Sequence, residues 1–253
     1  MNSQMTKTSE KYWEIKNQTE TSADLYIYSA ISSWGEEYGD TSAKDVINAV
    51  KALGSISHLN IYINSPGGSV FEGMAIKTFL ARQQYKKDVY IDGLCASIAT
   101  VVAFGINANV HIDSAALVMI HNAYSWVRGN AKELRKCADD LEKNDETIRG
   151  VYLDRTAGKL TEDEIRDMMD AETWLTASEC FEKGFVDEIV SNGTQAAACL
   201  PKEYFDLYKH VPKDVSVKDG VPDTKNTISA EMQAVIDKAD AVLKEYRHRK
   251  EQI

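Results

Sequence analysis

The sequence predicts an α/β fold in which strand–helix units follow one another and a long helical arm completes the body. Short runs of β-branched and aromatic residues alternate with segments whose apolar residues recur at helical spacing, from residue 24 to residue 120. This alternation is typical of a parallel sheet covered by helices. Beyond residue 121, capping signals introduce long helical segments.

The first half of the chain carries the strand–helix alternation. We expect strands at residues 12–16, 24–28, 58–64, 88–92, 108–112 and 116–120. Ser42 opens a helix that Gly54 ends as a C-cap glycine, and a second helix follows residue 69. Gly93 is predicted to form the turn between the strand at 88–92 and a buried helix that begins at Ser97.

The second half of the chain contains the helical arm. A capping box at residues 130–133 opens a helix of about seven turns. Similar signals at 161–164 and 176–179 open two shorter helices, and Gly184 stops the second of them. A strand at 185–190 completes the body.

We divide the chain into four parts: an N-terminal segment with an edge strand (1–23), a main domain (24–190), a linker (191–227) and a C-terminal amphipathic helix (228–253). Residues 212–227 are rich in lysine, aspartate, proline and glycine and lack periodicity, as linkers do. From residue 229 to 249, apolar residues recur at helical spacing.

The composition argues against several classes of partner. The 29 lysines and arginines against 39 acidic residues give a formal net charge of −10, whereas a surface for nucleic acid needs a basic surplus. The four cysteines are scattered and form no metal-ligand pattern, so we expect neither a metal nor another cofactor. No apolar stretch reaches the ~20 residues that span a bilayer. We therefore expect a cytoplasmic protein with no membrane partner.

Ser97 precedes an apolar helix, and two roles fit that position. A serine there is most often an N-cap that accepts hydrogen bonds from the backbone. A catalytic serine would also need a base, an acid that orients the base, and an oxyanion pocket. Cys95 is a rival nucleophile, although two positions before a helix we expect it to pack inside.

The chain offers candidates for each of these partners. His121 follows the strand at 116–120, and side chains at the carboxyl ends of neighbouring parallel strands can meet in one crevice. The loop at 64–68 contains two glycines, which let backbone N–H groups approach a bound oxygen closely. Spacing alone does not choose the acid, for which the candidates are Asp113, Asp167, Asp170 and Glu172.

Five ordered segments carry a resemblance: residues 63–70, 73–76, 96–97, 119–121, and 175–179 with 184–187. They are similar to the successive motifs of the ClpP family of serine peptidases, over about residues 25–190. The resemblance implies a fold of the ClpP and crotonase type, with Ser97 as nucleophile, His121 as base and the N–H groups of Gly68 and Ile98 as the oxyanion hole. It also implies stacked homo-oligomeric rings that act on protein substrates.

The sequence departs from the housekeeping branch of that family. Glu172 stands two positions before Trp174, where that branch has an aspartate, so we assign Glu172 as the acid and keep Asp170 as the alternative. Residues 122–124 replace the usual glutamine and proline, and a tail of about 60 residues is added. These features resemble the phage-encoded, ClpP-related head maturation proteases, which trim capsid or scaffold proteins.

The sequence thus indicates an ATP-independent serine endopeptidase, a hydrolase that needs no cofactor. Three alternatives remain open: a housekeeping peptidase that works with an AAA+ unfoldase, an acyl-CoA enzyme of the crotonase type, and an inactive capsid-assembly component. The altered N-terminal segment and the added tail disfavour the first, and the presence of both Ser97 and His121 disfavours the second.

Overall fold

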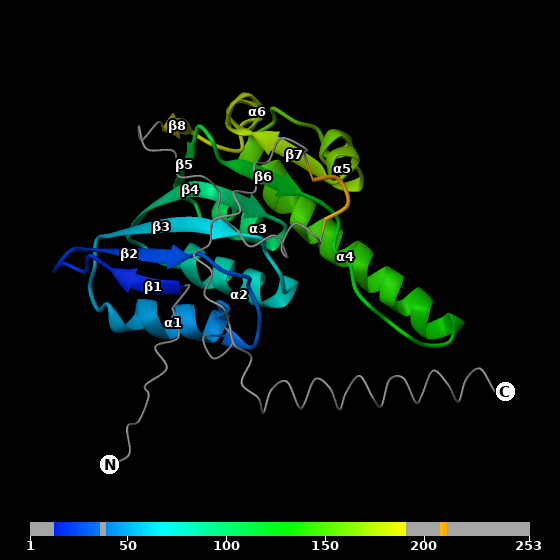
Figure 1. Cartoon of the computed structure of the whole chain (residues 1–253), viewed down its shortest axis with the longest axis horizontal. Coiled ribbons are helices and arrows are strands. Elements are labelled where there is room, and N and C mark those ends of the chain that lie inside the picture. Colours follow the sequence, from blue (N-terminus) through cyan, green and yellow to red (C-terminus); the bar gives the residue numbers. More distant parts are fainter. Residues whose placement is uncertain (1–12, 36–38, 191–207, 212–253) are drawn as a thin grey trace, which may run out of the picture. The chain divides into compact units, whose positions relative to one another are not determined.

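The computed structural model describes residues 13–35, 39–190 and 208–211. Residues 1–12, all of the predicted linker except 208–211, and the predicted C-terminal helix lie outside the described residues. The described chain builds an eight-stranded sheet with both parallel and antiparallel neighbours (Figure 1). The predicted α/β fold is confirmed.

Six strands form the continuous part of the sheet, in the order β1-β2-β3-β4-β5-β8. Neighbours from β2 to β8 are parallel, and only β1 joins antiparallel, at the β2 edge. The strands are β1 (Trp13–Lys16), β2 (Ser22–Ile27), β3 (His58–Ser65), β4 (Lys86–Ala96), β5 (Asn109–Asp113) and β8 (Glu188–Val190).

Two further strands branch from the end of β4. Strand β6 (Leu117–Ile120) pairs in parallel with the last three residues of β4. Strand β7 (Thr173–Thr176) pairs antiparallel with β6. The carboxyl end of β4 therefore lies beside β6 and apart from β5. This branch determines which side chains meet at the site described below.

Helices α1 (Ala43–Ala52), α2 (Val70–Ala81) and α3 (Ile98–Phe104) cover one face of the sheet (Figure 1). Because side chains alternate between the two faces of a strand, alternate aliphatic residues of β2, β3 and β4 point to this covered face and join one core; they are Ala23, Leu25, Ile27, Leu59, Ile61, Ile63, Val89 and Ile91. Every residue of α3 is buried. The helix that follows Ser97 thus begins inside the core.

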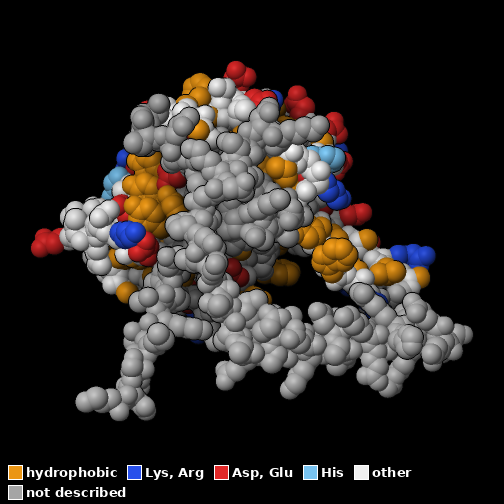
Figure 2. Space-filling view, in the orientation of Figure 1, with side chains coloured by type: hydrophobic (Ala, Val, Ile, Leu, Met, Phe, Trp, Pro, Cys, Tyr) orange, Lys and Arg blue, Asp and Glu red, His pale blue; other side chains and the backbone are white. Residues whose placement is uncertain are grey.

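The predicted arm is the helix α4 (Ala131–Thr156), 26 residues long, with the capping box expected at Asn130. Its C-terminal half packs on the body through Ile148, Tyr152 and Thr156, and its N-terminal half projects from the body (Figure 1). The loop before it and its first turns expose hydrophobic side chains, which Figure 2 shows in orange along the arm; the largest are Tyr124, Trp126, Val127 and Leu134. Helices α5 (Glu162–Asp170) and α6 (Ala177–Lys183) also begin with the predicted capping boxes.

The prediction of a turn at Gly93 was wrong. Strand β4 continues through this residue to Ala96, because Leu94, Cys95 and Ala96 pair with β6. The register against β3 shifts between Ile63 and Ser65 at this point. The glycine marks an irregularity in a long strand, which is another common role for glycine within a strand pattern.

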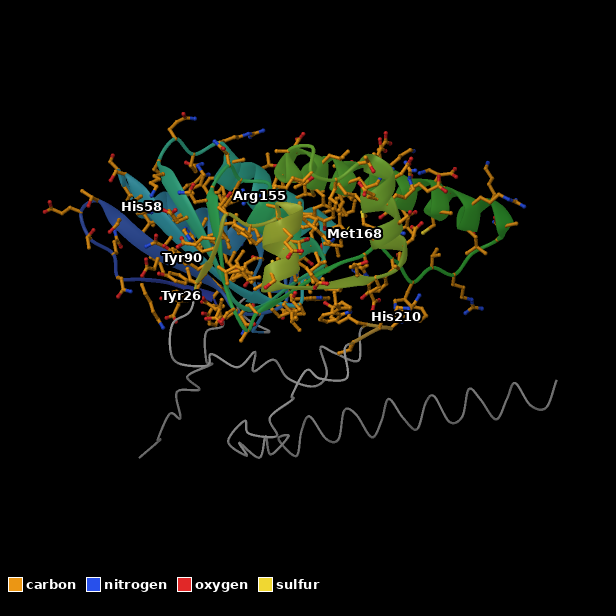
Figure 3. The ribbon with its side chains drawn as sticks, turned by 90° about the horizontal axis from the view of Figure 1, so that it is seen from above. Tyr26, His58, Tyr90, Arg155, Met168 and His210 are labelled. Atoms are coloured by element: carbon orange, nitrogen blue, oxygen red, sulfur yellow. The ribbon has the colours of Figure 1, made fainter. Side chains whose placement is uncertain are left out.

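The face of the sheet opposite the helices carries polar and aromatic side chains. Tyr26, Tyr62, Tyr90 and His111 stack in a row across β2 to β5, with ring centroids 4.6, 5.0 and 4.7 Å apart. Figure 3 shows Tyr26 and Tyr90 on this side. Such stacked contacts between neighbouring strands stabilise the register of the sheet.

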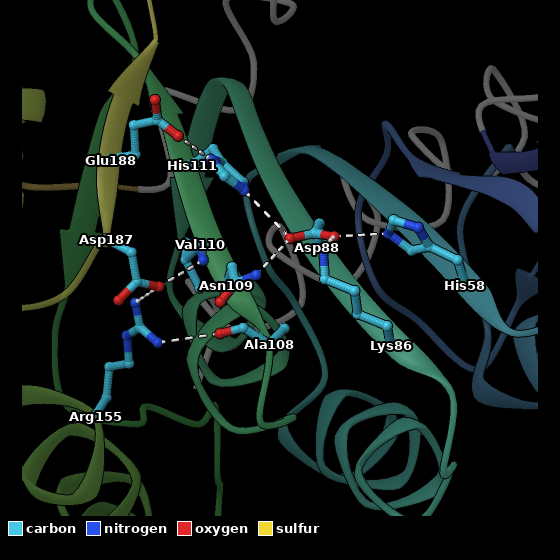
Figure 4. Close-up of polar contacts among 10 residues, drawn as sticks. All are labelled: His58, Lys86, Asp88, Ala108, Asn109, Val110, His111, Arg155, Asp187 and Glu188. Carbon is cyan, nitrogen blue, oxygen red and sulfur yellow. Dashed lines mark hydrogen bonds and ion pairs between the residues drawn. The ribbon is translucent and has the colours of Figure 1, made fainter.

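Asp88 is the centre of a polar network on β4 (Figure 4). The buried carboxylate contacts His58 Nε2 at 2.6 Å, Asn109 Nδ2 at 2.8 Å, Lys86 Nζ at 3.0 Å and His111 Nε2 at 3.4 Å. Burial by itself would raise the pKa of Asp88, but these hydrogen bonds outweigh it and hold the pKa well below its usual range. The network therefore ties β3, β4 and β5 together through an ionised carboxylate.

Within the described ranges, no helix combines the length and the apolar character that crossing a membrane requires.

Candidate active site

Ser97 lies at the junction between β4 and α3, in a conformation that side-chain-bearing residues rarely adopt. Its backbone has φ 54° and ψ −131°, and its side chain makes no capping hydrogen bond with the helix that follows. The N-cap role therefore does not describe this hydroxyl. Backbone strain of this kind gathers at functional sites.

The Ser97 hydroxyl contacts His121 instead. Ser97 Oγ and His121 Nε2 lie 2.8 Å apart. The register explains the meeting: Ala96 on β4 pairs with Met119 on β6, and the Ser97 N–H donates to the Met119 carbonyl at 2.9 Å. Both side chains therefore leave the carboxyl ends of neighbouring parallel strands on the same side.

The environment of His121 favours its neutral form. Burial lowers the pKa of the imidazole, the negative charge of Glu172 opposes that shift, and the positive charge of Lys209 adds to it, so that the net direction is downward. A neutral imidazole with its proton on Nδ1 can accept the hydroxyl proton of Ser97 at Nε2.

The loop after β3 packs directly against the Ser97 backbone. Gly67 has φ 86°, and a Cβ placed on it would lie 2.6 Å from the Ala96 carbonyl oxygen, 2.7 Å from Ser97 Cβ and 3.0 Å from the Ile98 nitrogen. Gly68 has φ 141° and leaves equally little room, at the backbone of Ile31. Only glycine fits this approach.

Several hydrogen bonds hold this glycine loop in place. Ser65 Oγ donates to the Ser29 carbonyl at 2.6 Å, and the Ile31 N–H donates to the Gly67 carbonyl at 2.7 Å. The side chain of Asn64 accepts from the Leu94 N–H at 2.9 Å, which links the loop to β4. The loop and the nucleophile strand thus form one fixed unit.

The two leading acid candidates lie at a cavity of about 500 Å³ that His121 also lines. Asp170 accepts a hydrogen bond from the Asn122 side chain at 2.6 Å. Glu172 accepts the backbone N–H groups of Lys209 and His210, each at 2.7 Å, through one oxygen. Among the described residues, these two N–H groups are its donors and the His121 ring is not one of them.

The remaining candidates lie elsewhere. Asp113 accepts the Ala115 N–H in a turn after β5, and the Asp167 side chain is exposed on α5. Neither lines the cavity. Cys95 is fully buried, and that burial raises the pKa of its thiol well above the ordinary value, so it packs inside as expected and is a poor nucleophile.

Two comparisons with known proteins bear on this geometry. A family model described as Clp protease matches residues 15–193. The chain belongs to the Clp protease family. The structure is also similar to that of a ClpP1 mutant from Listeria monocytogenes, with a TM-score of 0.57 and 25% sequence identity over 67% of this chain and 91% of that one.

Membership of the Clp protease family gives the class of chemistry. Clp proteases are serine-type peptidases, which are hydrolases, and they act on protein substrates as oligomeric rings. The sheet and helices described above match the fold of this family.

Behind the Ser97 backbone, this Clp protease carries a buried hydroxyl pair that sequence reasoning missed. Thr100 donates its N–H, at 3.0 Å, and its hydroxyl, at 2.5 Å, to the Ser97 carbonyl. Since that hydroxyl has a single proton, the Tyr152 phenol, 2.6 Å away, donates to Thr100 Oγ1. The pair joins α4 to the nucleophile, and no local pattern in the sequence signals it.

A second missed contact holds the chain that leaves His121. Asp145 on α4 accepts the Ala123 N–H at 2.6 Å, and Asn122 is held by Asp170 as described. Asp145 thus holds the backbone, and Asp170 the Asn122 side chain, at the edge of the cavity. The helical arm thus contributes to the site from two positions, Asp145 and Tyr152.

The third missed feature is the segment 208–211, which lies against the site although it falls in the predicted linker. Figure 1 shows it beside β7 and α5, and Figure 3 labels His210 at this end of the molecule, remote from His58. The available signal was a concentration of apolar and aromatic residues at 204–211, unusual for a linker.

In the part of the chain that the structure describes, no group of three or more His, Cys, Asp or Glu side chains is arranged to hold a metal ion.

Proposed function

We propose that this Clp-family protein is a serine endopeptidase with Ser97 as nucleophile and His121 as general base. The observation that carries the proposal is the 2.8 Å contact between Ser97 Oγ and His121 Nε2 in an environment that lowers the pKa of the imidazole. His121 takes the hydroxyl proton as Ser97 attacks the scissile carbonyl. It then returns the proton to the leaving amine and activates the water that releases the acyl group.

We assign the oxyanion hole to the backbone N–H groups of Gly68 and Ile98, which would donate hydrogen bonds to the oxyanion. The glycine loop lies against the Ser97–Ile98 peptide closely enough that a methyl group on Gly67 would not fit, which supports this assignment. Preorganised donors of this kind stabilise the transition state by about 3 kcal/mol each.

Glu172 is our choice for the acid that orients His121, and Asp170 is the alternative. Two observations support Glu172: it lines the same cavity as His121, and its charge acts on the imidazole in the direction that favours the imidazolium. Asp170 is engaged by Asn122, which suits a role in holding the peptide backbone after His121.

The finer biological role rests on the sequence. Glu172 ahead of Trp174, the altered residues 122–124 and the tail resemble the phage-encoded head maturation proteases, which cleave capsid or scaffold proteins. We propose this role, in a cytoplasmic homo-oligomeric ring that works without ATP, a metal or an unfoldase. Co-purification with an AAA+ unfoldase, and dependence on it for folded substrates, would contradict that part of the proposal.

The test is labelling of the purified full-length protein by a fluorophosphonate probe, with casein hydrolysis as a second readout. We expect wild type to be labelled and to cleave casein, and Ser97→Ala and His121→Ala to do neither. His111→Ala is the control and should behave as wild type, since His111 lies on the open sheet face. Labelling that persists in Ser97→Ala would refute the mechanism. A protein that binds acyl-CoA and ignores the probe would instead be of the crotonase type.

A further inference from the structure

Tyr208 fills the space between the two sides of the candidate active site. Its phenol donates a hydrogen bond to the carbonyl of Pro66 in the glycine loop. Its ring meets His121 edge to face, with centroids 6.0 Å apart, and meets Trp174 in the same way at 5.5 Å. One side chain therefore touches the glycine loop, the proposed base and the strand that follows the proposed acid.

The pocket that receives Tyr208 is apolar. Leu94, Ala96 and Met119 form a small buried cluster beside the Ser97 strand, and Tyr208 and Val211 pack against it. Tyr208 is largely buried in this pocket, and that burial raises the pKa of its phenol far above the ordinary value. The segment is thus docked by packing as well as by hydrogen bonds.

The two residues between these anchors engage Glu172. The N–H groups of Lys209 and His210 are consecutive, and both point to the same carboxylate oxygen at 2.7 Å. Hydrogen bonds to an ionised carboxylate are stronger than neutral ones. In this arrangement Glu172 holds a peptide backbone.

We propose that residues 208–211 are a built-in occupant of the peptide-binding site, and that they must leave before a substrate binds and before Glu172 engages His121. The proposal rests on the proposed function, because it describes the regulation of the same site. A substrate whose scissile bond reaches Ser97 has to pass between the glycine loop and the chain after His121, where Tyr208 now lies.

The choice of glutamate over aspartate suits this exchange of partners. Glutamate has one more rotatable bond than aspartate, so its carboxylate reaches farther from the same backbone position. Glu172 has a backbone φ of 49°, and Lys209, His210 and His121 all line its cavity. In the proposed exchange, the longer side chain swings its carboxylate from the segment to the imidazole across this cavity.

Hydrogen exchange tests the docking without reference to activity. In full-length wild-type protein, we expect the amides of Lys209 and His210 to be protected, and in Tyr208→Ala to exchange as fast as an unstructured peptide. Tyr208→Phe keeps the ring contacts and loses only the bond to Pro66, so its protection should be intermediate. Amides that exchange freely in the wild type would overturn the proposal, whatever the activity.

The rate of fluorophosphonate labelling tests the effect on the site. Only molecules with an open site react, so the wild-type labelling rate is proportional to the fraction of open molecules. If that fraction is about one tenth, Tyr208→Ala should be labelled about tenfold faster. Phe181→Ala, which truncates a half-exposed ring on α6, should be labelled at the wild-type rate.

The two proposals fail in different ways. Equal labelling rates in wild type and Tyr208→Ala, with Ser97→Ala silent, would remove the occupant role and leave the peptidase intact. Protected amides together with no labelling of any variant would remove the peptidase function, and the regulatory role would fall with it.

Discussion

The phenol oxygen of Tyr152 lies 2.6 Å from the hydroxyl oxygen of Thr100, which in turn donates to the carbonyl of Ser97. Thr100 and Tyr152 are both buried. A residue near the C-terminal end of α4 is thereby connected, through the Thr100 side chain, to the backbone of the proposed nucleophile.

Tyr152→Phe removes the hydrogen bond to Thr100 and keeps the ring. We expect the free energy of unfolding to fall by about 1 kcal/mol, the usual net value of a buried hydrogen bond. Tyr85→Phe is the matched control, because the Tyr85 hydroxyl is buried and has no hydrogen-bond partner within the described residues. Urea unfolding compares the two, and equal losses would show that the Tyr152 hydroxyl contributes nothing.

Ser97→Gly should be more stable than Ser97→Ala. Both variants lose the nucleophile and should not be labelled by the probe. Glycine adopts the backbone angles of residue 97 without strain, whereas the alanine variant keeps the strain. The unfolding free energy of Ser97→Gly should therefore be higher by about 1 kcal/mol or more. Since the serine side chain makes no capping bond, no lost cap offsets this gain. Thermal unfolding measures the difference, and a less stable glycine variant would contradict the strain.

Gly67→Ala should abolish labelling, because the new methyl group would push the loop away from Ser97 and Ile98. Gly54→Ala controls for the backbone alone: Gly54 also has a positive φ, of 70°, but open space surrounds it, so this variant should lose only about 1 kcal/mol of stability and keep full labelling. An active Gly67→Ala enzyme would refute the proposed contact between loop and nucleophile.

The labelling rate should depend on the neutral fraction of His121. Since the pKa of His121 is lowered from its ordinary 6.5, the rate should decline in acid with a midpoint below pH 6.5. Glu172→Gln removes the charge that raises this pKa, so the midpoint should move to still lower pH. The His111→Ala variant controls for changes remote from the site. A midpoint that rises in Glu172→Gln would transfer the electrostatic role to another carboxylate.

Asp88→Asn should destabilise the protein at neutral pH and have little effect in strong acid. Because the folded state depresses the pKa of Asp88, the stabilisation is present above the ordinary value of 3.8 and is lost as the pH falls from there through the folded pKa. Wild type and variant should therefore converge in acid. Unfolding curves measured from pH 7 into strong acid, well below pH 3, follow this convergence, and a constant difference between the two proteins over that range would contradict the linkage.

Sequence patterns predicted the parts of the fold that local chemistry determines. The capping boxes at Asn130, Thr161 and Thr176 lie where they were expected, because a cap needs only a side chain and the next few backbone groups. The turn at Gly93 failed for the opposite reason. Pairing with β6, more than twenty residues away, extends the strand beyond its local signal.

In the candidate site too, the residues that local patterns indicate were predicted, and those that depend on long-range contacts were not. Ser97, His121 and the glycine loop were found because each follows a strand, and the sheet brings the ends of parallel strands together. The choice of Glu172 came from a family resemblance, since spacing could not separate it from Asp170. Tyr208 lies in a segment with no periodicity, and its contacts with Pro66 and His121 span 142 and 87 positions of the chain, so only the folded structure reveals them.

The close approach of Gly67 to the Ser97 backbone leaves no room for a side chain at residue 67, because any side chain there would displace Ser97, the proposed nucleophile. Under the proposed function, changes in which peptides are accepted are expected on the other side of the cavity, from Asn122 to Tyr124 and around Trp174. Residues 122–124 and Glu172 ahead of Trp174 are also among the positions at which this sequence departs from the pattern of the housekeeping branch. Selection among substrates can thus diverge there while the chemistry of bond cleavage stays fixed.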